Sequence, residues 1–423
     1  MKVLWFSNNP ALGIDYLYNK SKIKGTGGWL YALNDAIQHD LELSVVFHHP
    51  YKVDNFKYKN TSYFPIYTGN IILENIKNRF LGKVYDDDFL EDYLKIVNKV
   101  KPDIIHIHGT ENHFLCILDK VEIPIVISVQ GNLTVYSHKF FSGFHGKYIN
   151  CKNDPINIKS IIFGRKSFKS GLNFMSKMAK IESFYLKNSK NIIGRTDWDR
   201  QITRILAPKS NYFVGNEILR DNFYEEKWNN IYENGKIILF TTNGDNYYKG
   251  FETLCHSLTL LNEIGIHVEW RIAGVSNNSL INKITKKQLS TNYPASGLVL
   301  LGSLNAKELI KNLKQSHLYI MGSHIENSPN NLCEAMILGM PCVATFAGGT
   351  ASMIKAGEEG LLIQDGDPWA MAGAILELIS DKSKSVLFGK RARERALKRH
   401  NKENIIKKLL STYNTIIRYT NED

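Results

Sequence analysis

The sequence predicts an α/β protein with two domains, each built on a doubly wound parallel β-sheet. The chain has 423 residues, more than one hydrophobic core usually serves. Short apolar runs of strand length alternate throughout with amphipathic helical stretches, which is the pattern of parallel sheets with crossover helices. Hydrophobic residues make up 43% and charged residues 22% of the chain, so its composition is that of a folded globular protein.

The first half of the chain contains six predicted strands. They are Lys2–Phe6, Leu43–His48, Asp103–His108, Ile125–Gln130, Asn191–Gly194 and Tyr212–Val214. The amphipathic stretches between them predict helices, among them Trp29–Ile37, Asp88–Val100 and Met175–Ser189. The polar stretch Arg220–Gly235 then interrupts the pattern. We therefore place an N-terminal domain at residues 1–219.

The second half repeats this architecture. Its predicted strands are Lys236–Thr242, Val268–Ala273, Leu298–Leu301, Leu318–Met321, Pro341–Thr345 and Gly360–Ile363. Its predicted helices are Gly250–Ile264, Ala306–Lys314, Pro329–Leu338 and Pro368–Ile379, followed by two basic helices within Ser383–Arg418. The C-terminal domain is placed at 220–402, and a last helix, about 403–423, can pack back on the first domain. Because open parallel sheets bind ligands at the carboxyl ends of their strands, we expect the two domains to face an interdomain cleft.

The net charge of +12 indicates either an anionic partner or a composition that is biased toward lysine. Nucleic acid, an anionic membrane surface and phosphorylated substrates are the candidates, and a lysine-rich composition explains part of the excess. No zinc-finger spacing, aromatic-basic RNA signature or helix-turn-helix is evident, so nucleic acid is not expected as a partner. The five cysteines form no C-x-x-C pair, and neither a secretory signal nor a membrane-spanning run is evident. We expect a cytoplasmic protein.

The most informative segment runs from His324 to Thr345, between two predicted strands. Ser328 is expected to cap a helix at its N-terminus, Pro329 to occupy its first position and Gly339 to end it. The backbone N–H groups from Asn330 and Asn331 onward would then point at the carboxyl edge of the sheet. There the positive end of the helix dipole suits a diphosphate.

Glu334 lies in this otherwise apolar helix, four residues after Asn330. A carboxylate in such surroundings needs hydrogen-bond donors. Ribose hydroxyl groups of a nucleotide are one source of donors, and a structural arginine or lysine is the alternative.

The spacing of Glu326 and Glu334, followed by Ala-Met-x-x-Gly-x-Pro-x-Val-Ala-Thr and Gly348-Gly349, resembles the E-x7-E region of family 4 retaining glycosyltransferases of GT-B fold. The resemblance implies two Rossmann-like domains, and implies that Glu334 holds the donor ribose while Glu326 lies beside the transferred sugar. It extends to Lys249-Gly250, whose lysine contacts the donor phosphates in that family.

The resemblance supplies further site residues and is looser in the first half. Gly27 and Gly28 correspond to a glycine loop near the donor phosphates, although a simple turn is the alternative. His106 and His108 resemble a strand that ends in paired histidines, and core packing is favoured over metal binding. The variants in this half look like those of surface-polysaccharide enzymes. The resulting candidates are Glu326, Lys249 and Gln130 for catalysis, and Gly27, Gly28, Gly302, Asn330, Asn331 and Glu334 for donor binding.

Two departures from the family matter. A histidine is frequent in the family where this chain has Gln130, and an arginine where it has Gly244. Glutamine can bond a hydroxyl group but cannot carry a proton. The phosphate charge must then be met by Lys249 and another cation, for which Arg195 and Arg220 are candidates.

No metal or other cofactor is expected. Asp86-Asp87-Asp88 and Asp365-Gly366-Asp367 contain the D-x-D spacing of another glycosyltransferase fold class, but both precede predicted helices, where aspartates act as caps. The resemblance implies transfer of a sugar, with retention, from a nucleotide-sugar donor to a glycan or lipid-linked acceptor. A nucleotide-sugar epimerase or hydrolase of the same fold is one alternative. A non-catalytic basic protein that binds phosphates or nucleic acid is the other.

The stretch from His145 to Lys190 carries ten Lys or Arg residues against Asp154 and Glu182, with apolar residues interleaved. An anionic membrane surface is therefore a possible partner, and the enzyme would then work peripherally on the inner membrane face. The alternative is a solvated basic face whose apolar side packs on the domain.

Overall fold

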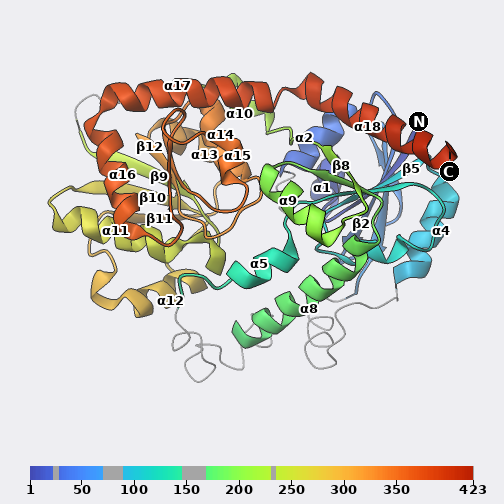
Figure 1. Ribbon diagram of the computed structural model, residues 1–423, viewed down its shortest axis with the longest axis horizontal. Coiled ribbons are helices and arrows are strands. Elements are labelled where there is room, and N and C mark those ends of the chain that lie inside the picture. Colours follow the sequence, from blue (N-terminus) through green and yellow to red (C-terminus); the bar gives the residue numbers. More distant parts are fainter. Residues whose placement is uncertain (22–27, 70–88, 145–167, 230–234, 423) are drawn as a thin grey trace. The chain divides into compact units, whose positions relative to one another are not determined.

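The computed structural model describes residues 1–21, 28–69, 89–144, 168–229 and 235–422 (Figure 1). Its contacts divide the chain into two units. The N-terminal unit comprises Met1–Ser137, Cys151–Ile218 and Asn401–Asp423, and the C-terminal unit comprises His138–Asn150 and Leu219–His400.

The N-terminal unit is built on an eight-stranded sheet with the order β3-β4-β2-β1-β5-β6-β7-β8. All neighbouring strands are parallel except β3 and β4, which form an antiparallel hairpin. The strands are β1 (Lys2–Ser7), β2 (Glu42–His49), β3 (Phe56–Tyr58), β4 (Thr61–Tyr67), β5 (Ile104–His108), β6 (Ile125–Ser128), β7 (Asn191–Gly194) and β8 (Asn211–Val214). The helices of this part of the chain are α1 (Ile14–Ser21), α2 (Gly28–Ile37), α4 (Leu90–Val100), α5 (Leu133–Lys139), α8 (Phe168–Lys187), α9 (Asp197–Leu206) and α18 (Lys402–Glu422).

Helices cover both faces of this sheet, as expected for a doubly wound fold. Alternate residues of β1 show the two cores: Trp5 packs with α2 and α18, whereas Phe6 packs with α4 and the end of α8. Helix α18 is anchored by the buried Tyr413, whose hydroxyl group accepts a hydrogen bond from Trp5 Nε1 (3.1 Å) and bonds His106 Nδ1 (2.6 Å). The last helix therefore belongs to the N-terminal unit.

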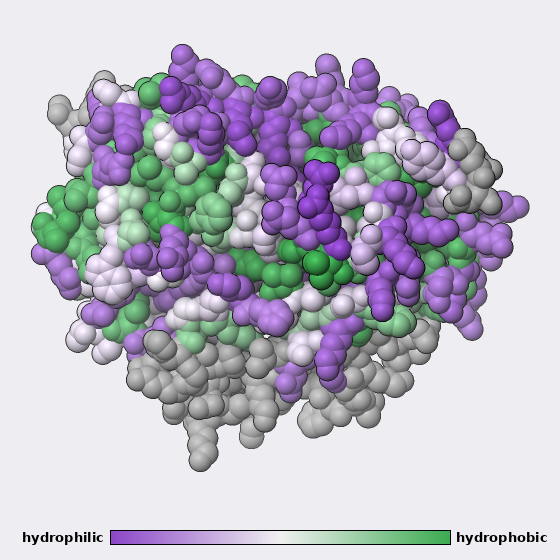
Figure 2. Space-filling view, viewed as in Figure 1, coloured by the Kyte–Doolittle hydropathy of each residue, from purple (hydrophilic) through white to green (hydrophobic). Residues whose placement is uncertain are grey.

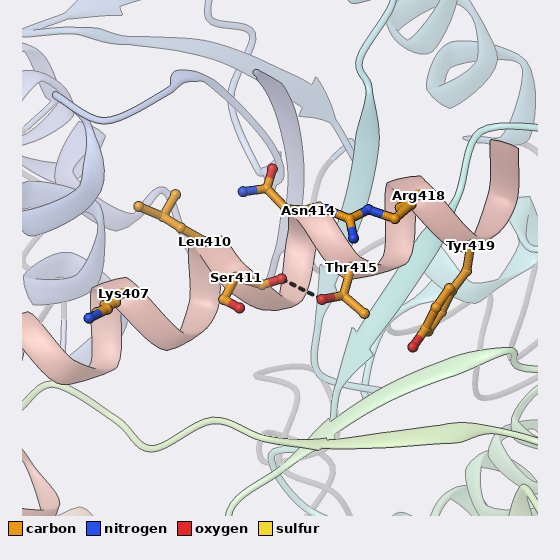
Figure 3. A pocket seen from close by; sticks show the side chains of 7 residues that line it. All are labelled: Lys407, Leu410, Ser411, Asn414, Thr415, Arg418 and Tyr419. Atoms are coloured by element: carbon orange, nitrogen blue, oxygen red, sulfur yellow. Dashed lines mark hydrogen bonds between the residues drawn. The ribbon is translucent and has the colours of Figure 1, made fainter. Parts of the chain in front are cut away.

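The outward side of α18 is polar. Its buried residues recur at Ile405, Leu409, Tyr413 and Ile416, the spacing of a helix with one apolar face. Figure 3 shows the other side, where a surface pocket is lined by Lys407, Leu410, Ser411, Asn414, Thr415, Arg418 and Tyr419.

The C-terminal unit is built on a six-stranded, all-parallel sheet with the order β11-β10-β9-β12-β13-β14. Its strands are β9 (Ile237–Thr242), β10 (Val268–Ala273), β11 (Leu298–Gly302), β12 (Leu318–Met321), β13 (Cys342–Thr345) and β14 (Leu361–Ile363). Its helices are α10 (Asp221–Glu225), α11 (Phe251–Glu263), α12 (Leu280–Leu289), α13 (Ala306–Lys314), α14 (Asn330–Leu338), α15 (Thr350–Met353), α16 (Pro368–Ser380) and α17 (Lys382–Arg399).

This sheet also has helices on both faces. One core contains residues of α10, α13 and α14, and the other contains residues of α11, α12 and α16. Helix α17 buries Phe388, Ala392 and Ala396, and the face shown in Figure 2 is mostly hydrophilic along its outer side. The two parallel-sheet α/β domains confirm the fold class that the sequence predicts.

The structure also differs from the sequence-based expectations. Residues 138–144 group with the C-terminal unit, although the sequence placed them in the first domain; the physical reason is that Phe144 is buried in the core between the sheet and α11. Helix α14 begins one residue later than expected: Pro329 is its N-cap, and the Ser328 hydroxyl group donates to Met353 Sδ (3.4 Å). Within the described residues, no helix is both long and apolar enough to cross a membrane.

Candidate active site

The order of the C-terminal sheet locates the site. Strands β10 and β11 lie on one side of β9, and β12, β13 and β14 lie on the other. Successive strands are therefore added to opposite edges of the sheet on the two sides of the β9–β12 pair. In open parallel sheets a ligand crevice forms at the carboxyl ends of such a pair. Asn331, in the first turn of α14, donates its Nδ2 to the carbonyl oxygen of Thr242 at the end of β9 (2.8 Å). This bond holds the N-terminus of α14 at the crevice.

The loop after β9 carries Lys249 and turns sharply at Gly250. Gly250 has a φ of +66°, and a Cβ atom there would lie 1.7 Å from the carbonyl oxygen of Gly322, which follows β12. Only glycine tolerates both this backbone conformation and this approach. The Lys-Gly pair thus brings the loop after β9 against the loop after β12.

Lys249, which is half-buried, and Glu326, which is buried, form an ion pair in this position. Lys249 Nζ lies 2.6 Å from Glu326 Oε1, which also accepts a hydrogen bond from Ser323 Oγ (2.8 Å). The Glu326 side chain is 7% exposed and that of Lys249 is 20% exposed. Burial lowers the pKa of the Lys249 ammonium group, but its charge interactions with Glu326 and Tyr248 and its hydrogen bond to Glu326 outweigh burial and raise that pKa. The lysine therefore remains a cation at neutral pH, where it can meet an anionic ligand.

Glu334 forms a second ion pair, with Arg220. Arg220 donates Nε to Oε1 and Nη2 to Oε2 of the carboxylate, both at 2.7 Å, in the bidentate geometry that arginine favours. Burial raises the pKa of Glu334, and Arg220 opposes that shift. Ribose hydroxyl groups and a structural arginine or lysine were the hydrogen-bond donors considered for Glu334. In the described structure Arg220 is such an arginine. Because Glu334 lies one turn along α14 from Asn330, Arg220 is held one turn from the start of that helix.

The start of α14 offers further donors. The backbone N–H groups of Asn330 and Asn331 precede the first backbone hydrogen bond of the helix, from Leu332 N to Pro329 O (3.0 Å). The side-chain oxygen of Asn330 is buried and has no hydrogen-bond partner among the described residues. Asn331 is engaged with Thr242, so its side chain has a structural role in this state.

The remaining candidates lie at carboxyl ends of strands or at the start of a helix. Gly302 ends β11 with a φ of +66° and accepts a hydrogen bond from Gly274 N (2.6 Å), which joins it to the loop after β10. Gly28 begins α2 with a φ of +54°. Gln130 follows β6 by two residues and is partly buried in the N-terminal unit. Gly27 lies outside the described residues.

The two cation candidates differ in their settings. Arg195 is buried in the N-terminal unit, where it lies 3.8 Å from Glu217 and 4.2 Å from the centre of the Trp29 ring. Arg220 belongs to the C-terminal unit, as do Lys249 and Glu326. Gly244 donates its N–H to Asn243 Oδ1 (2.7 Å) in the loop after β9.

Sequence reasoning missed a charged cluster beside this site. His324 Nε2 lies 2.6 Å from Glu252 Oε1, and His324 Nδ1 lies 3.4 Å from Asp365 Oδ2. The segment Asp365-Gly366-Asp367 contains a helix cap, as the sequence predicts: Asp367 caps α16 by accepting a hydrogen bond from Ala370 N, and Asp365 faces His324. The signal that could have found Glu252 is its position three residues before the apolar Cys255, because this spacing puts the carboxylate on the buried face of α11.

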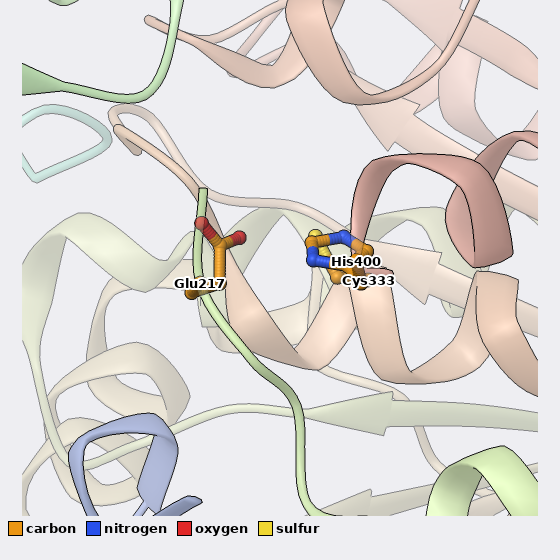
Figure 4. A group of neighbouring side chains, drawn as sticks. All are labelled: Glu217, Cys333 and His400. Atoms are coloured by element: carbon orange, nitrogen blue, oxygen red, sulfur yellow. The ribbon is translucent and has the colours of Figure 1, made fainter. Parts of the chain in front are cut away.

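The histidines of β5 are core residues in the described structure. His106 bonds Tyr413 and Ser128, and His108 packs edge-on against Trp5 with its ring centre 4.6 Å away. Figure 4 draws Cys333 of α14 and His400 after α17, both buried in the C-terminal unit, together with Glu217 of the N-terminal unit. Two protein ligands from one unit do not make a metal centre, so no ion is assigned to them. Asp86-Asp87-Asp88 lies outside the described residues.

Comparison with known proteins identifies the class of the C-terminal unit. Residues 222–395 match the protein family Glycosyl transferases group 1. The chain therefore carries a glycosyl transferases group 1 domain, which contains Lys249, Glu326 and Glu334. An assignment to family 4 in particular remains an expectation from the sequence.

Two curated relatives match part of the chain. The N-acetyl-alpha-D-glucosaminyl L-malate synthase of Bacillus anthracis is 31% identical over 25% of this chain and 28% of its own length. The capsular polysaccharide biosynthesis glycosyltransferase CapM of Staphylococcus aureus is 29% identical over 24% of this chain and 27% of its own length. The matches thus span about a quarter of each relative.

Solved structures match nearly the whole chain. Sucrose-phosphate synthase from Thermosynechococcus elongatus superposes with a TM-score of 0.72 at 13% identity, covering 99% of both chains. Anabaena HepE in complex with UDP and glucose superposes with a TM-score of 0.65 at 13% identity, covering 98% of this chain and 100% of that one. At this identity the likeness shows the fold alone, and the fold is GT-B.

Proposed function

We propose that the protein is a retaining glycosyltransferase that moves a sugar from a nucleotide-sugar donor to a glycan or lipid-linked acceptor in surface polysaccharide synthesis. The observation that carries this proposal is the Lys249–Glu326 ion pair at the carboxyl edge of the C-terminal sheet, within a glycosyl transferases group 1 domain. The names of relatives support it, since CapM takes part in capsular polysaccharide biosynthesis and HepE was solved with UDP and glucose.

In the proposed reaction, the enzyme stabilises the negative charge that develops on the leaving diphosphate. The Lys249 ammonium group and the N–H groups at the start of α14 are the donors for that charge. They are already fixed in place, so little reorganisation is needed as the sugar–phosphate bond breaks. The leaving phosphate accepts the proton of the acceptor hydroxyl group, and no metal ion is required.

Glu326 and Glu334 position the donor in this proposal. Glu326 exchanges part of its contact with Lys249 for a hydroxyl group of the transferred sugar, while Ser323 keeps the carboxylate oriented. Glu334 accepts hydrogen bonds from the ribose, and Arg220 is the second cation of the site. Gln130 bonds a sugar hydroxyl group, and Gly28 and Gly302 allow the backbone to approach the donor closely.

The acceptor and the location follow from the same proposal. A lipid-linked acceptor would bring the protein to the inner face of an anionic membrane. In the described part of α8, Lys177, Lys180 and Lys187 are exposed and Phe184 is 64% exposed, which supports such a surface. The buried Met178 of the same helix shows that part of the apolar residues packs inward instead.

The test is a donor screen. The purified protein is incubated with UDP-, GDP- and ADP-sugars, with and without lipid-linked oligosaccharide acceptors, and both nucleotide release and products are measured. We expect acceptor-dependent nucleotide release and a new glycoside with the anomeric configuration of the donor. An epimerised sugar nucleotide would indicate an epimerase, acceptor-independent release a hydrolase, and no turnover of any donor a non-catalytic protein.

A further inference from the structure

A buried charged cluster lies next to the proposed donor site without being part of it. The His324 imidazole, 2% exposed, is flanked by Glu252 Oε1 at 2.6 Å and Asp365 Oδ2 at 3.4 Å. Glu252 is itself 5% exposed and accepts a hydrogen bond from Thr253 Oγ1 (2.9 Å). A carboxylate–imidazole–carboxylate arrangement at this depth favours an imidazolium ion, since a neutral ring would leave the buried Glu252 carboxylate uncompensated.

The cluster joins the two loops that carry the Lys249–Glu326 pair. Glu252 follows Lys249 by three residues, and His324 precedes Glu326 by two. The backbone adds a second link, because His324 donates its N–H to the carbonyl oxygen of Tyr248 (2.8 Å). His324 is thus bonded to residues on both sides of Lys249. Its main chain bonds Tyr248, which precedes the lysine, and its side chain bonds Glu252, which follows it.

The segment 138–144 covers this cluster. A Cβ atom on Gly143, which has a φ of +84°, would lie 2.2 Å from Glu252 Oε1 and 2.6 Å from His324 Nε2, so the backbone there packs directly on the pair. The carbonyl oxygen of Gly143 accepts a hydrogen bond from Gln288 Nε2 (2.6 Å). The Lys139 ammonium group lies 3.5 Å from Asp365 Oδ2 and balances the second carboxylate.

The same segment also packs on the Lys249 loop. The Tyr247 ring contacts Phe141 and Phe144, with ring centres 5.1 and 5.6 Å apart. Phe140 contacts Tyr248, with ring centres 5.4 Å apart. These aromatic contacts hold the 138–144 segment against the Lys249 loop.

We propose that His324 is a positioning residue of the donor site, whose charged contacts with Glu252 and Asp365 hold the Lys249 loop against the Glu326 loop. Its role rests on the proposed function, since a fixed Lys249–Glu326 distance matters only if that pair meets a reacting donor. It does not touch the donor; it acts through the two loops. A shift of about 1 Å in such a group can cost roughly 100-fold in rate.

The charge on His324 is maintained over a wide pH range. Burial lowers the pKa of the imidazole, but its hydrogen bonds and charge interactions with Asp365 and Glu252 outweigh this and raise the pKa to about 9. The charged groups that face the cluster are Glu252 on α11, Asp365 before α16 and Lys139 on the 138–144 segment. We therefore expect the loops to loosen as the pH rises through about 9.

The test compares His324→Gln with His317→Gln. His317 is a matched control, because it is a buried histidine at the opposite end of β12, where its Nδ1 accepts a hydrogen bond from Ile238 N (3.0 Å). For His324→Gln we expect kcat to fall roughly 10- to 100-fold, with a smaller change in the KM for the donor, and the alkaline step near pH 9 to disappear. For His317→Gln we expect kcat and its pH profile to match those of the wild type.

Hydrogen exchange supplies a readout that does not depend on activity. In His324→Gln, amides of residues 247–252 and 322–327 are expected to exchange at least about 10-fold faster, while His317→Gln leaves both segments protected. If the wild type turns over no donor, the proposed function fails. Hydrogen exchange alone then still shows whether His324 holds the Lys249 loop against the Glu326 loop. Unchanged exchange and unchanged kcat in His324→Gln would overturn the proposal. Should that variant not fold, Glu252→Gln removes the negative charge from the same contact, and wild-type exchange rates in that variant would overturn the proposal equally.

Discussion

The Arg220–Glu334 pair leads to an asymmetric prediction for stability. Removing one partner of a buried ion pair leaves the other without compensation, at a cost of about 3–5 kcal/mol when that group stays buried. The Glu334 side chain is 8% exposed, whereas that of Arg220 is 27% exposed. Arg220→Met therefore strands a buried carboxylate, but Glu334→Met leaves a guanidinium group that can reach water.

The expected costs follow from that difference. We expect Arg220→Met to lower the free energy of unfolding by about 3–5 kcal/mol at pH 8. We expect Glu334→Met to lower it by about 1–2 kcal/mol, the typical value for a lost hydrogen-bonded contact. The double variant, which removes both charges, should be more stable than Arg220→Met alone, because no group is left buried and unpaired.

The stability defect of Arg220→Met should depend on pH, because Glu334 titrates. Burial already raises the pKa of Glu334, and loss of Arg220 raises it further. A carboxyl group with a raised pKa in the folded state destabilises that state increasingly as the pH rises, so the defect of Arg220→Met should be smaller at pH 5 than at pH 8. Urea unfolding followed by circular dichroism at both pH values measures this. Equal costs for the two single variants, or a double variant as unstable as Arg220→Met, would mean that removing Arg220 does not leave Glu334 buried and unpaired.

Three further predictions concern the donor, the metal and the charge state. Glu334→Gln should weaken donor binding by about 1.5–3 kcal/mol, and unchanged affinity by calorimetry in the folded variant would exclude the ribose role. Turnover should survive excess chelator, and loss of activity that manganese or magnesium restores would contradict metal independence. His324, with a pKa raised from 6.5 to about 9, should contribute about 3 kcal/mol of stability that is fully present below pH 6.5 and lost as the pH rises through about 9. Urea midpoints of the wild type and His324→Gln should converge above that pH, and a constant difference would contradict the assignment.

The membrane prediction has a separate test. The wild type should sediment with vesicles that contain anionic lipid at low salt, and high salt should release it, because surface charges are screened. Replacing the exposed Lys177, Lys180 and Lys187 of α8 by glutamine should weaken this binding, whereas replacing the exposed Lys382 and Lys390 of α17 should not. Binding that does not depend on lipid charge and salt, or no binding at all, would mean that the protein does not dock on an anionic membrane surface.

Most strands and helices could be predicted because their residues satisfy local rules. Gly339 ends α14 with a φ of +90°, as the pattern predicts, and Asp367 caps α16. The strand β4 could not be recognised, because it contains Pro65, which cannot donate to a neighbouring strand. The structure accommodates it because β3 pairs only with Thr61, Ser62 and Tyr63, so the position beside Pro65 needs no donor there.

The site was predictable in part for a different reason. Glu326 and Glu334 stand in one segment, so their spacing and apolar surroundings are visible in the sequence. Their partners, Lys249 and Arg220, lie 77 and 114 residues away, and composition alone does not pair them. His324 and Glu252 are 72 residues apart, and the contact depends on two loops that meet only when β9 and β12 are neighbours.

Donor turnover by Lys249→Met tests whether Lys249 meets the donor phosphates. Lys236→Met is the matched control, since Lys236 also pairs with a glutamate in the C-terminal unit, Glu269 at 2.9 Å, but is 60% exposed. With both variants shown to be folded by circular dichroism, we predict that Lys249→Met loses roughly 100- to 1000-fold in kcat/KM for acceptor-dependent nucleotide release, while Lys236→Met does not. Lys249→Arg, which keeps the charge, should recover part of the loss. Turnover by Lys249→Met at the wild-type rate would mean that Lys249 does not stabilise the leaving diphosphate.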